Sequence, residues 1–154
     1  MPEYNILLKK VEPQLVASHR EIIATYQEVG KLFEELFGYL ARFHAGGLCA
    51  ALWHDAGFKA KDVDAEAVVY LENPVPESDR VKVYALPGYT VASVIHKGSY
   101  NNLNQAYEAI WKWIEDNGFR CCAPNREIYL YSPEPFSNDN ESYVTEIQFP
   151  VEKA

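Results

Sequence analysis

The chain has 154 residues, enough for one domain that buries most of its apolar surface, and its hydrophobic fraction of 48% excludes wholesale disorder. Its formal net charge is −8, with 14 basic against 22 acidic side chains, which disfavours nucleic-acid binding because that binding depends on neutralising phosphates. No apolar run reaches the roughly 18 residues of a membrane span, and the N-terminus lacks a signal-type apolar segment. We therefore expect a cytoplasmic protein.

The first half of the chain is predicted to contain strands around one long helix. Apolar residues at helical spacing predict that helix from about His19 to His44, and Gly46-Gly47 is expected to end it. Alternating or compact apolar runs predict the strands. These are expected at residues 4–11, 14–18, 48–54 and 64–71.

A connector with two prolines, residues 73–79, leads into the second half. A regular apolar stripe from Leu103 to Ile114 predicts the second helix, which Asn117-Gly118 is expected to end. Pro150 is expected to end the last strand. The strands of this half are predicted at residues 81–86, 89–96, 127–131 and 143–149.

The two halves repeat one pattern. Val16-Ala17-Ser18 corresponds to Val91-Ala92-Ser93 at an offset of 75 positions (91 − 16), and Glu66 corresponds to Glu146 at an offset of 80 (146 − 66). This repetition predicts a single α+β domain over residues 1–154 with two pseudo-symmetric β-α-β-β units, about 1–79 and 80–154. We expect a curved antiparallel sheet with both helices on one face and a ligand cleft between the units on the other.

Strand parity selects the side chains that are expected in this cleft. In the last strand the apolar set should pack under the helices, which leaves Glu146 facing the cleft. We apply the same argument to the neighbouring strands. The expected cleft-facing set is Glu127, Tyr129, Tyr131 and Glu146 in the second half and Ala51, Trp53, Glu66, Val68 and Tyr70 in the first.

A carboxylate between aromatic rings suits either a binding site or an enzyme. The charge attracts a cation, and each aromatic face adds roughly 0.5–2 kcal/mol of cation–π stabilisation. A partly desolvated carboxyl group also suits general acid–base chemistry. The alternative for Glu146 is an ordinary solvated strand residue, and the tyrosines could be surface residues of high β propensity. The histidines and cysteines show no metal-ligand spacing, so we assign no metal and no cofactor.

An ordered set of motifs resembles the GyrI-like small-molecule-binding family, which includes effector-binding domains of AraC-type and MerR-type transcription regulators. The set consists of Val91-Ala92-Ser93, His96-Lys97-Gly98, Glu127-Ile128-Tyr129 and Thr145-Glu146-Ile147-Gln148-Phe149-Pro150-Val151. The resemblance implies a duplicated fold of the SHS2 type with a ligand cleft between the units. It also implies binding of lipophilic cations by a buried glutamate among aromatic residues, and Glu146 and Glu127 match the acidic motif positions.

The favoured function is binding of an amphipathic, cationic aromatic drug or toxin by Glu146, Glu127, Tyr129, Tyr131, Trp53 and Tyr70. The resemblance also allows a hydrolase of cyclopropane-bearing compounds, with Glu146 and Tyr129 as its catalytic pair; no Gly-x-Ser-x-Gly nucleophile motif is present. A third alternative is a gyrase-protecting interaction protein. Tyr39, Phe43 and Trp113 lie off the helix stripes and allow such a partner or a homodimer. We expect a stand-alone protein or an excised effector domain whose DNA-binding partner domain is absent.

Overall fold

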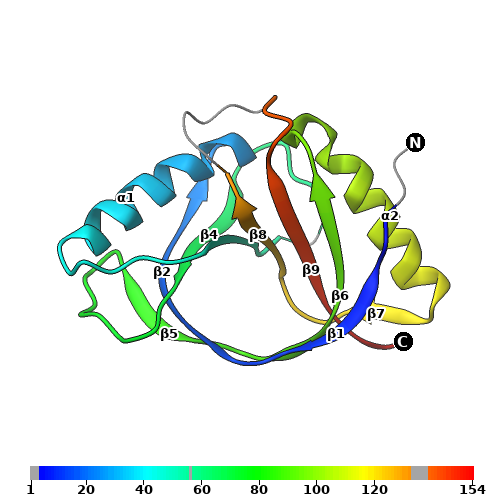
Figure 1. Ribbon diagram of the computed structural model, residues 1–154, viewed down its shortest axis with the longest axis horizontal. Helices are drawn as coiled ribbons and strands as arrows, with labels where there is room; N and C mark the ends of the chain where they lie inside the picture. The colour runs from blue at the N-terminus through cyan, green and yellow to red at the C-terminus, as the bar shows by residue number, and fades with distance from the viewer. Residues whose placement is uncertain (1–3, 56, 133–138) are drawn as a thin grey trace. The chain divides into compact units, whose positions relative to one another are not determined.

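The computed structural model describes residues 4–55, 57–132 and 139–154, and the chain forms two compact units (Figure 1). The N-terminal unit comprises Glu12–Gly88. The C-terminal unit comprises Met1–Val11 together with Tyr89–Ala154. The first strand thus belongs to the same unit as the end of the chain, and the strand after the proline-containing connector belongs to the N-terminal unit.

The N-terminal unit is an antiparallel sheet with one helix on one face. Its strand order is β5-β2-β4-β3. Helix α1 places Leu32, Leu36 and Leu40 against Ala65, Ala67 and other buried side chains of the sheet. The elements are β2 (Gln14–Ile23), α1 (Val29–Ala41), β3 (Cys49–Trp53), β4 (Val63–Tyr70) and β5 (Lys82–Leu86).

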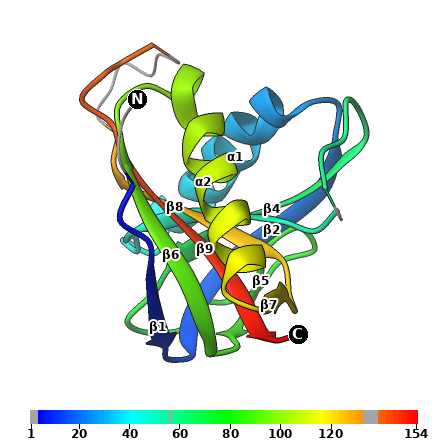
Figure 2. The same ribbon diagram turned by 90° about the vertical axis from the view of Figure 1, so that its right-hand side faces the viewer.

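The C-terminal unit has the same arrangement, with strand order β1-β6-β9-β8 and a short strand β7 paired with β9. Helix α2 lies along this sheet (Figure 2) and buries Ala106, Ile110 and Ile114 against Ile147 and Phe149. Its elements are β1 (Leu7–Val11), β6 (Tyr89–Lys97), α2 (Leu103–Asp116), β7 (Phe119–Cys121), β8 (Asn125–Tyr131) and β9 (Val144–Lys153).

The predicted α+β class is confirmed, and the strand registers show how closely the units repeat. Val16 of β2 pairs with Tyr84 of β5, and Val91 of β6 pairs with Lys9 of β1. Both residues of the second pair differ from those of the first by 75 positions (91 − 16 and 84 − 9). Strand β1 therefore has the same place in the C-terminal unit that β5 has in the N-terminal unit.

Three predicted boundaries are wrong. Helix α1 ends at Ala41, before His44 and the predicted stop at Gly46-Gly47. Residues 19–23 continue β2 instead of starting the helix, because His19 to Ile23 pair in register with β4. Strand β9 continues through Pro150 to Lys153, and the Pro150 carbonyl accepts a hydrogen bond from the Cys122 N–H at 2.9 Å. Strand β7 was not predicted from the sequence, and it pairs with residues 151–153 of β9.

Within the described residues, neither helix is long and apolar enough to cross a membrane.

Candidate functional site

The sheet of the C-terminal unit carries one buried glutamate on each face. Glu127 of β8 pairs with Ile147 of β9, whereas Ile128 pairs with Glu146. Residues paired in register share a face of the sheet. Since Ile147 packs under α2, Glu127 lies on the face that α2 covers, here called the helix face. Glu146 lies on the opposite face.

The prediction that Glu127 and Tyr129 share a face with Glu146 is therefore wrong. It assumed that the apolar residues Ile128 and Leu130 pack under the helix, but Leu130 is 41% exposed. Glu127 takes the helix face because α2 supplies Tyr107 as a hydrogen-bond donor to its carboxylate. A polar side chain can be buried where such a partner is available.

In the N-terminal unit, Trp53 and Ala51 also lie on the helix-covered face instead of the predicted cleft face. Trp53 of β3 pairs with Ala65, packs against the core under α1, and meets the Tyr26 ring edge-on at 5.1 Å between centroids. Ala51 pairs with Ala67 and lies on that face as well. For β4 the parity was right: its core residues alternate with the remaining predicted ones, which are Glu66, Val68 and Tyr70.

Tyr131 stands apart from the other predicted aromatic residues. A register shift between Tyr129 and Tyr131 pairs Tyr131 with Val144, and the Tyr131 side chain is 54% exposed. The six residues predicted to form one ligand site thus fall on different faces and in different units.

On the helix face, Glu127 forms a hydrogen-bonded cluster with two tyrosines and an asparagine. The Tyr129 hydroxyl donates to Glu127 Oε1 at 3.0 Å, and the Tyr107 hydroxyl donates to Oε2. Asn125 Nδ2 donates to the Tyr107 hydroxyl oxygen at 3.0 Å. Glu127 is only 7% exposed, so these groups replace water as its hydrogen-bond donors. We call these four residues the Glu127 cluster.

Aromatic rings surround the Glu127 cluster. The Tyr107 ring lies 5.4 Å from Trp111 and 5.9 Å from Phe149, between centroids, and the Tyr129 ring lies 6.0 Å from Tyr100. Trp111 is 48% exposed, so this aromatic group extends from a buried carboxylate to the surface of α2. Burial, reinforced by the charge of Glu127, raises the pKa of Tyr129 well above its ordinary value, which keeps its hydroxyl a proton donor.

On the opposite face, Glu146 has a cation in direct contact. Its Oε2 accepts hydrogen bonds from Ser93 Oγ at 2.7 Å and Gln148 Nε2 at 2.8 Å, and Lys9 Nζ lies 2.6 Å from the same oxygen. Burial raises the pKa of Glu146, but Lys9, Gln148 and Ser93 together outweigh this effect and lower the pKa. The carboxylate is therefore ionised and its charge is balanced by an ammonium group of the same unit.

Glu66 is the counterpart of Glu146 in the N-terminal unit. It accepts hydrogen bonds from Ser18 Oγ at 2.6 Å and from the Tyr84 hydroxyl, and His54 Nε2 lies 2.7 Å from its other oxygen. Ser18 and Tyr84 occupy the positions that Ser93 and Lys9 occupy in the other unit. The duplication thus conserved a serine–glutamate pair, while the neighbouring strand supplies a phenol in one unit and an ammonium in the other.

Sequence reasoning did not assign Tyr107, Asn125 or Lys9 to any site. The helical stripe correctly placed Tyr107 beside the core, but the stripe alone does not show that its hydroxyl meets Glu127. Lys9 reaches Glu146 because β1 pairs with β6, where its partner Val91 lies 82 positions further along the chain (91 − 9). Neither contact has a local sequence signal.

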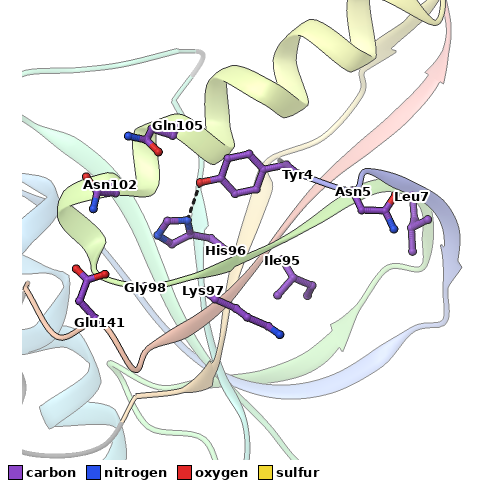
Figure 3. A pocket seen from close by; sticks show the side chains of 10 residues that line it. All are labelled: Tyr4, Asn5, Leu7, Ile95, His96, Lys97, Gly98, Asn102, Gln105 and Glu141. Atoms are coloured by element: carbon purple, nitrogen blue, oxygen red, sulfur yellow. Dashed lines mark hydrogen bonds between the residues drawn. The ribbon is translucent and has the colours of Figure 1, made fainter. Parts of the chain in front are cut away.

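A half-open pocket of about 670 Å³ lies elsewhere in the C-terminal unit, between the segment before β1, the end of β6 and the start of α2 (Figure 3). At its edge the Tyr4 hydroxyl contacts His96 Nδ1 at 3.0 Å, and His96 Nε2 contacts the Ser99 carbonyl at 3.0 Å. None of the six predicted ligand-binding residues lines this pocket. Among the residues that the structure describes, no group of three potential metal ligands is present.

Comparison with known proteins gives matches along nearly the whole chain. A family model for the GyrI-like small molecule binding domain matches residues 4–152. The crystal structure of the EcmrR C-terminal domain is 31% identical, has a TM-score of 0.85, and the match covers 98% of this chain and 99% of that one. In the cryo-EM structure of EcmrR with DNA, the TM-score is 0.84 at 31% identity; the match covers 98% of this chain but 58% of that chain.

Two more distant structures show the same fold at 14% identity. A hydrolase from Listeria innocua has a TM-score of 0.67, with 97% of this chain and 92% of that chain covered. SAV2435 bound to tetraphenylphosphonium has a TM-score of 0.59, with 98% and 94% covered. No curated protein sequence matches the chain at a significant level.

Proposed function

The chain belongs to the GyrI-like small molecule binding domain family, and on this basis we propose that it binds a cationic, aromatic small molecule at the Glu127 cluster. The ligand's positive charge would be held by the Glu127 carboxylate. Its apolar part would contact the rings of Tyr107, Tyr129 and Trp111. The proposal keeps two of the residues that the sequence analysis selected, Glu127 and Tyr129, and adds two from α2.

The observation that carries the proposal is that two phenols, Tyr107 and Tyr129, donate to the buried Glu127 carboxylate. Glu146 contacts a Lys9 ammonium at 2.6 Å, so a ligand cation would have to displace that group. The described donors to Glu127 are phenols, whose rings offer faces and edges to a ligand. Cation–π contacts with such rings add to the attraction of the carboxylate. The tetraphenylphosphonium complex of SAV2435, a relative in fold, supports the same chemical class of ligand.

We further propose that the chain works as the effector domain of a DNA-binding regulator in the cytoplasm. EcmrR contains a domain like this one as 58% of the chain that is bound to DNA. The DNA-binding partner domain would lie on the remaining part of such a regulator. Ligand binding in a separate domain is a common means of controlling DNA binding, because each state can be favoured by differential contacts.

Titration of tetraphenylphosphonium by calorimetry tests the binding site. Glu127→Gln keeps the shape of the side chain and removes its charge, and we expect at least a tenfold loss of affinity, of the order that loss of a charge-assisted contact gives. Glu146→Gln is the matched control, since it makes the same change one register position away on the opposite face. We expect it to alter affinity by less than about twofold. A larger loss in Glu146→Gln than in Glu127→Gln would overturn the assignment.

A hydrolase is the second candidate, and the structure changes its catalytic pair. Glu146 and Tyr129 lie on opposite faces of the sheet and cannot act on one bond. The Tyr129 hydroxyl lies 3.0 Å from Glu127 Oε1, and Tyr129 keeps its proton. Glu127 could therefore act as the base and Tyr129 as the proton donor. Turnover of a cyclopropane-bearing substrate that Glu127→Gln abolishes, with binding retained, would support an enzyme. Absence of turnover at high protein concentration would exclude that substrate class.

The gyrase-protecting role, the homodimer and the cleft between the two units stay predictions from the sequence.

A further inference from the structure

We propose that Asn125 is a positioning residue, which orients the Tyr107 hydroxyl so that its single proton points to Glu127. The proposal rests on the proposed function, because it concerns the carboxylate that is to hold the ligand. Asn125 is the first residue of β8 and is half-buried. Its side-chain amide donates to the Tyr107 hydroxyl oxygen, and we propose that it acts on Glu127 through this phenol.

The chemistry of the phenol fixes the direction of both hydrogen bonds. A tyrosine hydroxyl has one proton to donate and lone pairs to accept. The Glu127 carboxylate can only accept, so the Tyr107 proton is donated to Oε2. The Tyr107 oxygen then accepts hydrogen bonds, and the Asn125 amide nitrogen at 3.0 Å donates one to it. The same requirement determines which end of the Asn125 amide faces the phenol.

The hydrogen bond from Asn125 to the Tyr107 oxygen strengthens the hydrogen bond from Tyr107 to the Glu127 carboxylate. Hydrogen bonds in a chain polarise one another, so the Asn125 contact makes Tyr107 a stronger donor to Glu127. Donation to a carboxylate favours its charged form over its protonated form. Asn125 thereby favours the charged form of Glu127 through the Tyr107 hydrogen bond. An ionised Glu127 is the form that binds a cation.

The test compares Asn125→Leu in the natural background and in a Tyr107→Phe background. Leucine has nearly the size of asparagine and no donor. In the natural background we expect tetraphenylphosphonium affinity to fall about threefold, and the pH midpoint of cation binding to rise. In the Tyr107→Phe background the same substitution should leave affinity and midpoint unchanged, because the group on which Asn125 acts is missing. An equal loss in both backgrounds, or an unmoved midpoint, would overturn the proposal.

Asn125→Asp provides a second variant if Asn125→Leu does not fold. A carboxylate at this position accepts the Tyr107 proton instead of donating to its oxygen, so Tyr107 would turn away from Glu127. We expect Asn125→Asp to lower tetraphenylphosphonium affinity about tenfold in the natural background. In the Tyr107→Phe background the same substitution should cause a smaller loss. An affinity equal to that of the natural protein would count against the positioning role.

A readout without ligand separates this inference from the proposed function. The carboxyl carbon of Glu127 can be titrated by NMR in the free protein, and Asn125→Leu should move its midpoint to higher pH. If Glu127→Gln leaves cation affinity intact while this shift is observed, the proposed function fails and the positioning role stands. If the shift is absent while Glu127→Gln loses affinity, the positioning role fails and the proposed function stands.

Discussion

The two faces of the β8–β9 strand pair provide the most instructive comparison in the molecule. Glu127 and Glu146 are adjacent in register, on opposite faces, and each is 7% exposed. Their partners differ: an ammonium, a hydroxyl and an amide contact Glu146, whereas two phenols donate to Glu127. Burial alone therefore does not identify a binding carboxylate. The Lys9 ammonium balances the charge of Glu146 within the protein, whereas the phenols at Glu127 donate hydrogen bonds.

The two units also differ in the partners of their corresponding glutamates, Glu66 and Glu146. Glu66 and Glu146 occupy corresponding positions and keep a serine donor, but among the described contacts a lysine lies beside Glu146 and a histidine beside Glu66. In both units this position carries a hydrogen-bonded carboxylate on the face away from the helix. Its recurrence in both units favours a structural role.

The largest difference between the faces is expected in their apolar packing. Ile147→Ala removes a fully buried side chain from the helix face and should lower the free energy of unfolding by about 3 kcal/mol, through lost burial and the cavity left behind. Ile95→Ala on the opposite face is the matched change, and because Ile95 is 40% exposed it should cost less than about 1 kcal/mol. Denaturant unfolding of both variants measures this, and equal losses would contradict the assignment of the core.

A smaller effect is expected from the charge of Glu146. Because its partners lower the pKa of Glu146 below the ordinary value of 4.5, its carboxylate stabilises the fold above that pH, and this stability is lost as pH falls through the lowered folded-state value. Glu146→Gln should therefore cost about 1–2 kcal/mol near neutral pH. The difference from the natural protein should shrink in acid. Urea unfolding across this range tests it, and a difference that grows in acid would have the wrong sign.

The smallest effect concerns the cation that Glu146 already contacts. If Lys9 is what keeps ligand cations away from Glu146, Lys9→Met should create a second, weaker tetraphenylphosphonium site. Adding Glu146→Gln should remove that site again. Lys10→Met is the control, because Lys10 neighbours Lys9 on β1 and its side chain points to the other face. A single tetraphenylphosphonium site in Lys9→Met would show that Lys9 is not the reason why ligand cations bind at Glu127 and not at Glu146.

The sequence predicted the α+β class, the duplication and the parity of the central strands, because β4 and β9 have a clear apolar set facing the helix. On β3 and β8, strand alternation predicted the wrong face for the side chains. There the residues under the helix include Trp53 and Glu127, and Ile128 faces the other way. The polar group on the helix face is stabilised by Tyr107 of α2, a tertiary contact that strand periodicity does not encode.

The helix predicted from His19 shows a related limit. The apolar stripe of that helix starts only at Val29, and pairing with β4 makes residues 19–23 a strand. Lys9 is a further case, since its contact with Glu146 depends on pairing between the start of the chain and its second half. Pairing partners far apart in sequence decide these features, and composition or local spacing does not reveal them.

A crystal structure of the protein with tetraphenylphosphonium tests the central claim most directly. The account predicts the cation against the Glu127 carboxylate and the rings of Tyr107 and Tyr129, on the helix face of the C-terminal unit, with Lys9 still paired to Glu146. A ligand seated at Glu146, with Lys9 displaced from that carboxylate, would contradict it.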